Sequence, residues 1–428
     1  MKGGLQAARG PESGEAFWTS VREQFPLTRD YLHFAQFFMV SHPRPVTAAI
    51  ERHRQALDAN PFLTVEHGMF ASPEESHVER IFAAAAGYLG SAKDEVALIP
   101  NTTTGLALVY HGLQLAPGDE VLTTADEHFV HHEAIRLATA RVGASWRKFR
   151  IVADSRRPSL REILARVRAA IRPETRVLGL SWVYSNSGLR LPLRAISELV
   201  AAVNRDRPAD RAIITVADAT HGFGALEDRA ADLGCDFFVS STHKWLFAPR
   251  GTGILYAPTD RWHQLQPVIP TYYTWDLWES WAAGAPPTLA TRPTHVSPGG
   301  FLAYEHQWAM VEAFEFHQRI GRERVAARIH ELNGHLMDRL SGIRQVRLHT
   351  PRDPEWSAGM VSFDVAGMTA AEVVEGLLQR RVIASSSPYA ESRARLSAGI
   401  MNTMEEVDAA ADALREVASA RRRVGSVR

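Results

Sequence analysis

The sequence is poor in cysteine, in long apolar runs and in any excess of one charge. Its 428 residues include one cysteine, Cys235, so no internal disulfide framework can form, which fits a reducing cytoplasm. No apolar run is long enough to span a bilayer, and residues 1–14 lack the apolar core of a signal peptide. Basic and acidic residues number 48 each. We therefore expect a cytoplasmic protein with neither nucleic acid nor membrane as a partner.

What the sequence does contain is the composition of a globular enzyme. Hydrophobic residues make up 45% and charged residues 22%, which is ordinary for a folded chain in water. A chain of this length exceeds one ordinary hydrophobic core, so two main domains are expected.

One stretch, 216–256, carries two strand-like runs that end in reactive side chains. The apolar run 212–217 stops at Asp218, and the run 236–241 stops just before Lys244. Each pattern predicts a buried strand of a parallel sheet. Open α/β sheets gather ligands outside the carboxyl ends of their strands, so we expect Asp218 and Lys244 to face one site.

An acid and a lysine placed in this way suit pyridoxal 5′-phosphate (PLP). The lysine amine bonds to the aldehyde of the cofactor, and the acid keeps the pyridine nitrogen protonated. The bulky residues 245–247 follow Lys244, and burial among apolar groups lowers the pKa of a lysine and makes its amine a nucleophile. A surface lysine and a loop aspartate are the ordinary alternative, but this apolar context favours PLP.

The run Ser241-Thr242-His243-Lys244, with Asp218 and His221 upstream, resembles class V aminotransferases over most of the chain, roughly 31–414. The resemblance implies a fold-type I PLP enzyme: an α/β protein with a large, mostly parallel sheet domain and a smaller C-terminal α/β domain. The domains expected on this basis are an N-terminal arm, a segment packing with the small domain, the large PLP-binding domain and the small domain, at 1–30, 31–72, 73–300 and 301–428.

A short strand at 96–99, a hydroxyl-rich turn at 100–105 and a helix expected over 106–113 form a pattern typical of an anion site. Free amide groups and the helix dipole face a ligand at such a point, although an ordinary N-cap has the same composition. By resemblance to the family, the cofactor phosphate is held by Thr102, Thr103, Ser241 and His243.

Three histidines, His128, His131 and His132, follow the strand-like run that begins at Gly118. In the family, a histidine after a glutamate stacks on the cofactor ring, which implies His128 as the stacking residue and a candidate proton shuttle. A metal site is the alternative, but no partner motif supplies further ligands, so no metal is expected. We expect His131 and His132 to lie on the substrate side or in solvent.

Resemblance also implies the residues that hold the substrate. Asn186, in a Ser-Asn-Ser-Gly turn, corresponds to the residue that helps hold the substrate carboxylate, and His221 to one that bonds the ring oxygen; turn chemistry explains either residue as well. When the chain is aligned with the family on the closing Asn-Thr-x-x-Glu-Val motif, Arg395 corresponds to the arginine that binds the substrate carboxylate. An alignment shifted by two residues would give that role to Arg393. A guanidinium grips a carboxylate with two parallel hydrogen bonds.

An aromatic-dense stretch at 271–281 is expected to form a loop. Its composition suits a wall around a large polar ligand and suits a subunit interface equally well. The stretch 297–300 resembles the region that relatives project into the phosphate site of the partner subunit. This implies a homodimer with a shared active site.

The reaction follows less directly from these residues. A cysteine desulfurase needs a mobile cysteine late in the chain, whereas Cys235 precedes Lys244, where a buried structural role is expected. The sequence looks most similar to the isopenicillin N epimerase-like branch, which includes PLP enzymes of lincosamide antibiotic biosynthesis that process cysteine S-conjugates. The leading hypothesis is β-elimination, a C–S lyase reaction, on a bulky cysteine S-conjugate in bacterial secondary metabolism.

Three alternatives stand beside that hypothesis. Decarboxylation coupled to oxidative deamination would convert the same substrate to an aldehyde, and an amino-acid epimerase would leave all other bonds intact. A PLP-binding regulatory module is disfavoured, because no basic DNA-binding extension precedes the fold.

Overall fold

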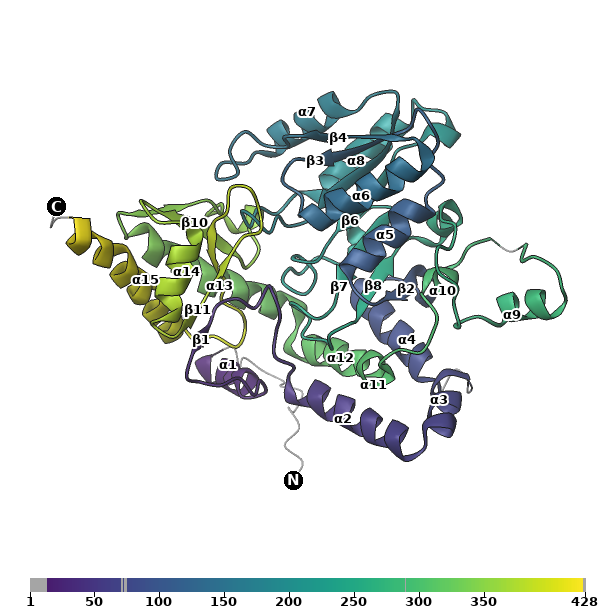
Figure 1. The fold of residues 1–428 in the computed structure, drawn as a ribbon, viewed down its shortest axis with the longest axis horizontal. Coiled ribbons are helices and arrows are strands. Elements are labelled where there is room, and N and C mark those ends of the chain that lie inside the picture. Colours follow the sequence, from purple (N-terminus) through teal and green to yellow (C-terminus); the bar gives the residue numbers. More distant parts are fainter. Residues whose placement is uncertain (1–13, 71, 73–74, 289, 426–428) are drawn as a thin grey trace.

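The computed structural model describes residues 14–70, 72, 75–288 and 290–425, without the side chains of residues 421–425. Residues 1–13, which belong to the expected N-terminal arm 1–30, lie outside the described part. The chain forms a large half around a seven-stranded sheet and a smaller half around a four-stranded sheet (Figure 1). The predicted α/β class with a large, mostly parallel sheet is confirmed.

The large sheet has the strand order β2-β8-β7-β6-β5-β3-β4. Strand β8 is antiparallel to both of its neighbours, and the other neighbouring strands are parallel. In sheet order, the strands are β2 (Val96–Ile99), β8 (Gly253–Tyr256), β7 (Phe237–Ser241), β6 (Ile214–Asp218), β5 (Thr175–Ser181), β3 (Glu120–Thr124) and β4 (Ser145–Phe149).

Helices cover both faces of this sheet. Because side chains alternate along a strand, Val177 of β5 packs with one layer and Leu178 with the other. The first layer holds α5 (Thr102–Gly112) and α6 (Phe129–Val142). The second holds α4 (His77–Leu89), α7 (Leu160–Ala170), α8 (Leu193–Asn204), α11 (Tyr304–Trp308) and α12 (Met310–Ile320). These two apolar layers bury the sheet and leave its carboxyl edge as the place for a site.

The smaller sheet is antiparallel, with the order β12-β13-β10-β9. Its strands are β9 (Val346–Leu348), β10 (Val361–Val365), β12 (Ser385–Ser386) and β13 (Ala394–Leu396). Three helices share its core: α13 (Arg322–Ser341), α14 (Ala370–Leu378) and α15 (Met404–Gly425). Tyr304 and Trp308 of α11 and Phe314 of α12 belong instead to the core of the large half.

The N-terminal segment joins the two halves. After α1 (Glu15–Arg22), strand β1 (Leu32–His33) pairs in parallel with β11 (Val382–Ile383) of the smaller half. Helix α2 (Arg44–Ala59) then runs along α11 and α12, and α3 (Pro61–Phe70) follows it. The predicted domain boundaries stay a prediction.

Two local expectations are corrected. The stretch 271–281 is not a loop throughout, because residues from 275 onward form helix α9 (Trp275–Ala282), which ends an arm that projects from the large half (Figure 1). Helix α5 begins at Thr102 rather than at 106, since the Asn101 side chain accepts a hydrogen bond from the Thr104 amide and caps it there.

The short helix α10 (Pro293–Val296) lies between this arm and α11. Within the described residues, no helix is long and apolar enough to cross a membrane.

Candidate active site

A cavity of about 760 Å³ lies at the carboxyl ends of β6 and β7 and is closed by residues of the smaller half. It brings together side chains from β6, from the loop after β7, from the start of α5 and from β12 and β13. Every predicted site residue except Asn186 lines it: Thr102, Thr103, His128, Asp218, His221, Ser241, His243, Lys244 and Arg395.

Lys244 lies three residues after the end of β7, and Asp218 is the last residue of β6. Burial lowers the pKa of Lys244 to about 8, with Asp218 opposing the shift and Arg395 adding to it. At neutral to mildly alkaline pH a substantial fraction of its amine is therefore uncharged and able to attack a carbonyl. Asp218 and Lys244 therefore line one cavity, as the strand pattern predicts, and their roles toward the cofactor stay a prediction.

Two backbone features hold the lysine loop in place. Gly224, with φ of 87°, lies so close to the backbone of Trp245 and Leu246 that an added Cβ would come within 2.7 Å of it. Phe247 adopts a φ of 62°, a left-handed conformation that a bulky residue takes only when its surroundings impose it. The turn after β6 and the loop after β7 are thus packed into one rigid unit that carries both Asp218 and Lys244.

A cluster of hydroxyl groups lines the cavity at the start of α5. The Thr102 amide donates to Ser241 Oγ (2.8 Å), and the Ser241 amide donates to Thr102 Oγ1 (2.7 Å). The Thr102 hydroxyl also lies 2.6 Å from that of Thr220. Hydroxyls and amide donors at the N-terminus of an eleven-residue helix form a favourable place for a phosphate.

Two histidines, His221 and His243, line the cavity. The Nδ1 atoms of His221 and His243 are buried and lack a hydrogen-bond partner within the described residues. Burial lowers the pKa of His243 to about 4 and that of His221 well below its ordinary value, so both rings are neutral at pH 7. A neutral imidazole in the cavity lining can donate to a phosphate or bond a ring hydroxyl. The residues present therefore fit PLP.

Arg395 closes the cavity from the side of the smaller half. Its Nη1 donates to the Ser185 carbonyl (2.8 Å), and its Nη2 donates to the Ser386 carbonyl (2.9 Å) and to Ser385 Oγ (3.0 Å). Burial lowers its pKa to about 10. No acid forms an ion pair with it in the part of the chain that the structure describes, although it is only 5% exposed. Arg393, its competitor, instead pairs with the exposed Glu391 at 3.5 Å.

The three histidines of the 128–132 stretch have different surroundings. His128 lines the cavity at the N-cap of α6, and burial lowers the pKa of its ring. His131, expected on the substrate side or in solvent, is fully buried instead, because α6 turns it inward against Tyr110 and Glu127. His132 is half-buried and bonds the Thr124 carbonyl at 2.8 Å. No group of metal ligands gathers among the described residues.

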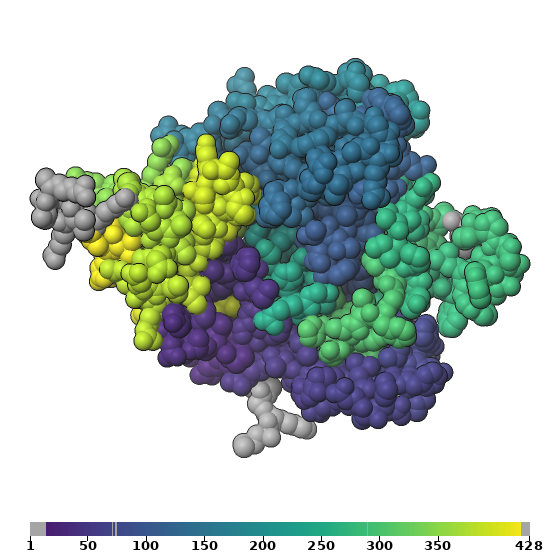
Figure 2. Space-filling view, viewed as in Figure 1, coloured from purple at the N-terminus to yellow at the C-terminus, as the bar shows by residue number. Residues whose placement is uncertain are grey.

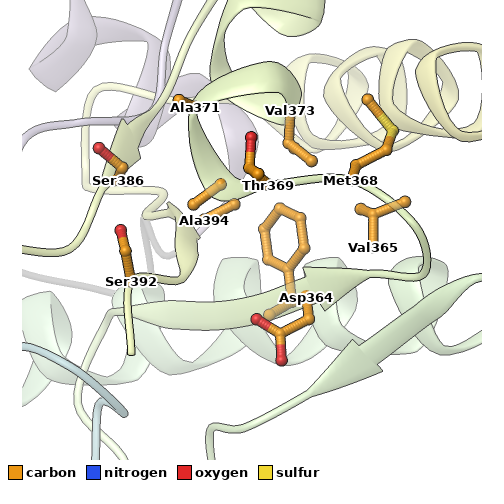
Figure 3. A pocket seen from close by; sticks show the side chains of 11 residues that line it. Asp364, Val365, Met368, Thr369, Ala371, Val373, Ser386, Ser392 and Ala394 are labelled. Atoms are coloured by element: carbon orange, nitrogen blue, oxygen red, sulfur yellow. The ribbon is translucent and has the colours of Figure 1, made fainter. Parts of the chain in front are cut away.

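Asn186 and the aromatic arm lie outside the cavity lining. The Asn186 Oδ1 accepts from Ser387 Oγ (2.9 Å), and its carbonyl accepts from Ser362 Oγ (2.7 Å), so it links the two halves. The residues 271–281 line no part of this cavity in the same chain. A separate cavity of about 300 Å³ lies between α14 and β10 of the smaller half (Figure 3), and Ser386 borders both cavities.

Sequence reasoning missed several hydroxyl groups at the site. Thr220 completes the cluster with Thr102 and Ser241, and its place two residues beyond a strand-ending acid was the signal that could have identified it. The Ser185 carbonyl and the Ser385 hydroxyl bond Arg395, but nothing in the sequence distinguishes these two serines from turn residues. Their role depends on the approach of two distant segments.

Comparison with known proteins identifies the family. The aminotransferase class V family matches residues 41–410, and the chain belongs to it. Members of this family depend on PLP, in agreement with the predicted cofactor and with the donor groups of the cavity.

The individual relatives carry three kinds of name: isopenicillin N epimerase, L-cysteine desulfhydrase-like protein and probable cysteine desulfurase. Isopenicillin N epimerase of Streptomyces clavuligerus is 33% identical over 340 residues, which is 77% of this chain and 81% of the relative. The L-cysteine desulfhydrase-like protein lolT1 of Epichloe uncinata is 26% identical over 262 residues, 60% of this chain and 54% of that protein. The fold matches the structure of the cystine C–S lyase C-DES bound to its product cysteine persulfide, with a TM-score of 0.80 and 23% identity over 92% of this chain and 99% of that one.

Proposed function

We propose that this protein is a PLP-dependent C–S lyase that acts on a bulky cysteine S-conjugate in bacterial secondary metabolism. The observation that carries the choice of an amino-acid substrate is Arg395, a buried guanidinium at the cavity wall that forms no ion pair among the described residues. A substrate carboxylate would supply the missing negative charge, taking the N–H of Nη1 that the described residues leave free and replacing one of the protein oxygens that the other N–H groups now bond.

The protein's own groups have distinct tasks in this proposal. Lys244 would bond the cofactor aldehyde, Asp218 would face its ring nitrogen, His128 its ring face and His221 its ring oxygen. Thr102, Thr103, Ser241 and His243 would hold its phosphate. PLP supplies an electron-accepting ring that stabilises negative charge at the substrate Cα.

Proton movement at the substrate falls to Lys244. Arg395, with Asn186 steadying the turn beside it, fixes the carboxylate and so orients the bonds at Cα. The Nζ atom of Lys244, with its pKa lowered to about 8, accepts the Cα proton. The C–S bond then breaks with both electrons leaving on sulfur, which takes up a proton as a thiol. With one water, the remaining three-carbon fragment becomes pyruvate and ammonium.

The absence of a thiol from the cavity separates this proposal from cysteine desulfurase chemistry. Cys235 lies in the core of the large half, 3% exposed, and burial raises the pKa of its thiol to about 12. A thiol in that state is a poor nucleophile. The sulfur of the substrate would therefore depart as a free thiol rather than pass to the protein. The name of the Epichloe uncinata relative supports the same class of reaction.

An amino-acid epimerase is the second candidate, and the 33% identity to isopenicillin N epimerase favours it. Both reactions begin with removal of the Cα proton by Lys244. They differ in the next step. In the lyase reaction a leaving group departs from Cβ, whereas in the epimerase reaction a proton returns to Cα on the opposite face. One substrate panel can therefore distinguish them.

We also propose that the enzyme is a homodimer. The arm that carries α9 projects from the surface (Figures 1 and 2), and three of its tryptophans, Trp275, Trp278 and Trp281, are 60%, 56% and 77% exposed. Exposed aromatic groups at this density are typical of a subunit interface.

The proposed reaction is tested with purified holoenzyme and a panel of S-alkyl and S-aryl L-cysteine conjugates. Release of equal amounts of thiol and pyruvate supports the lyase. Aldehyde and carbon dioxide with oxygen uptake would replace it with oxidative decarboxylation. Conversion of L- to D-amino acid with the C–S bond intact would replace it with epimerisation.

A further inference from the structure

Glu127 is a buried carboxylate behind the wall of the active-site cavity. It is 2% exposed and directly precedes His128 in the chain. The Thr124 hydroxyl donates to its Oε1 at 2.7 Å, and the Ser181 hydroxyl donates to its Oε2. The Nδ1 of His131 lies 3.2 Å from the same Oε2. Three groups thus converge on one acid that the proposed reaction does not use.

The hydrogen bonds of this cluster fix its protonation. Burial alone would raise the pKa of Glu127, but the bonds from His131, Ser181 and Thr124 outweigh burial and lower it, so the side chain is a carboxylate at neutral pH. A carboxylate only accepts, hence His131 donates from Nδ1. In a neutral ring Nε2 then accepts from the Tyr110 hydroxyl, 2.7 Å away, whose pKa burial raises.

The cluster touches the cavity at two points. Ser181 lines the cavity and is the register partner of Asp218 in the β5–β6 pair. His128 lines the cavity as well, and its position depends on the turn 124–128 that Glu127 ties to β5 and α6. The Ser181 side chain therefore contacts the Glu127 carboxylate and also lines the cavity.

We propose that Glu127 is a second carboxylate serving the cofactor site, which positions His128 and adds negative charge beside Asp218. The partners of this side chain call for an acid, because both of its oxygens accept hydrogen bonds, whereas a glutamine has one acceptor oxygen and an amide group that only donates. Negative charge held in a wall of low dielectric favours a protonated ring nitrogen in the cavity. The inference rests on PLP binding but not on the reaction proposed above, so the product assay does not bear on it.

Other charged and titratable groups face the same region and are unchanged in the variants below. Besides Tyr110 and His131, those of the cavity and of the cluster are Asp126, His128, His132, Tyr184, Asp218, His221, His243, Lys244, Tyr389 and Arg395.

The test compares Glu127→Gln with Glu133→Gln in the holoenzyme. Glu133 lies on α6, which begins two residues after Glu127, but is exposed and pairs with Arg136, so the control makes the same chemical change away from the cavity. We expect the pH midpoint of the visible band of the bound cofactor to fall by about half a unit or more in E127Q. The cofactor dissociation constant should rise several-fold. Both quantities should match the wild type in E133Q.

Two further variants separate charge from packing. His131→Gln keeps the carboxylate and a donor to it, so its midpoint should stay near that of the wild type; an equal fall in E127Q and H131Q would show a packing effect and overturn the proposal. If E127Q does not fold by circular dichroism, Glu127→Met, which removes the charge at nearly equal volume, should lower the midpoint by a similar amount. A wild-type midpoint in E127Q, or in E127M where that variant decides, overturns the proposal.

Discussion

The guanidinium carbon of Arg395 lies 4.6 Å from the centroid of the Phe37 ring. Phe37 comes from the N-terminal segment that follows β1, and Arg395 comes from β13, so the contact joins two remote parts of the chain at the cavity. The ring also lies 6.3 Å from that of His221. An aromatic residue in the N-terminal segment thus holds the proposed carboxylate-binding group against the cofactor site.

Replacing Phe37 by alanine should therefore weaken substrate binding. A desolvated cation–π contact contributes about 0.5–2 kcal/mol, which corresponds to a rise in KM of roughly 2- to 30-fold. Steady-state kinetics with a cysteine conjugate measures the KM of the variant and of the wild type. Phe62→Ala, at an exposed position on α3, is the matched control and should keep the KM of the wild type. An unchanged KM in F37A would mean that the three polar partners of Arg395 suffice to hold it.

Arg395→Ala should damage substrate binding far more than folding. A hydrogen bond to a charged group contributes about 1.5–3 kcal/mol, so KM should rise about 10- to 150-fold, while the visible band of the bound cofactor remains. Arg393→Ala removes a side chain paired with exposed Glu391 and should behave as wild type. The reverse pattern, with R393A impaired and R395A normal, would show that Arg393 binds the carboxylate.

The lowered pKa of Lys244 predicts how the apoenzyme captures its cofactor. Only the uncharged amine attacks an aldehyde, and burial lowers its pKa from 10.5 to about 8. The second-order rate of PLP capture by apoenzyme should therefore rise with pH to a midpoint near 8 and then level off. Stopped-flow absorbance measures it, with Nα-acetyl-lysine as the exposed reference. A midpoint above 10, equal to that of the reference amine, would contradict the burial of Lys244.

The exposed tryptophans of α9 predict a change in assembly. A double variant, Trp278→Ala with Trp281→Ala, should shift the protein from dimer to monomer at micromolar concentration, because large aromatic residues dominate interface energetics. Size-exclusion chromatography with light scattering measures the mass. Leu160→Ala, an equally simple truncation of an exposed apolar residue on α7, should leave the dimer intact. A wild-type enzyme that is monomeric throughout would refute the proposal.

The strand-ending residues were predictable, whereas the convergence of distant segments was not. Asp218 and Lys244 follow apolar runs that end at the same sheet edge, and that rule needs only local sequence. Gly90 ends α4 with a φ of 75°, a left-handed conformation that glycine adopts readily, so this helix end also depends on local sequence. His131 was placed wrongly, because its orientation depends on the side of α6 that meets Tyr110.

The aromatic stretch at 271–281 shows a second limit. Its composition is compatible with a loop, a pocket wall or an interface, and the short helix α9 adopts its conformation at the end of a projecting arm rather than in a core. Residues such as Ser385, which bonds Arg395, acquire a role only once β12 and β13 pair. The roles of these residues depend on contacts between segments that are distant in the sequence, not on local propensity.

The most direct test concerns the residue that carries the cofactor. Holoenzyme reduced with borohydride, digested and analysed by mass spectrometry should carry the added pyridoxyl phosphate mass on the peptide containing Lys244. The other lysines that the structure describes are exposed, Lys93 in a surface ion pair with Glu79 and Lys148 at the edge strand β4. Modification of Lys244 alone is the expected result. Label on another lysine, or a protein that binds no PLP and shows no visible band, would contradict the assignment of the site.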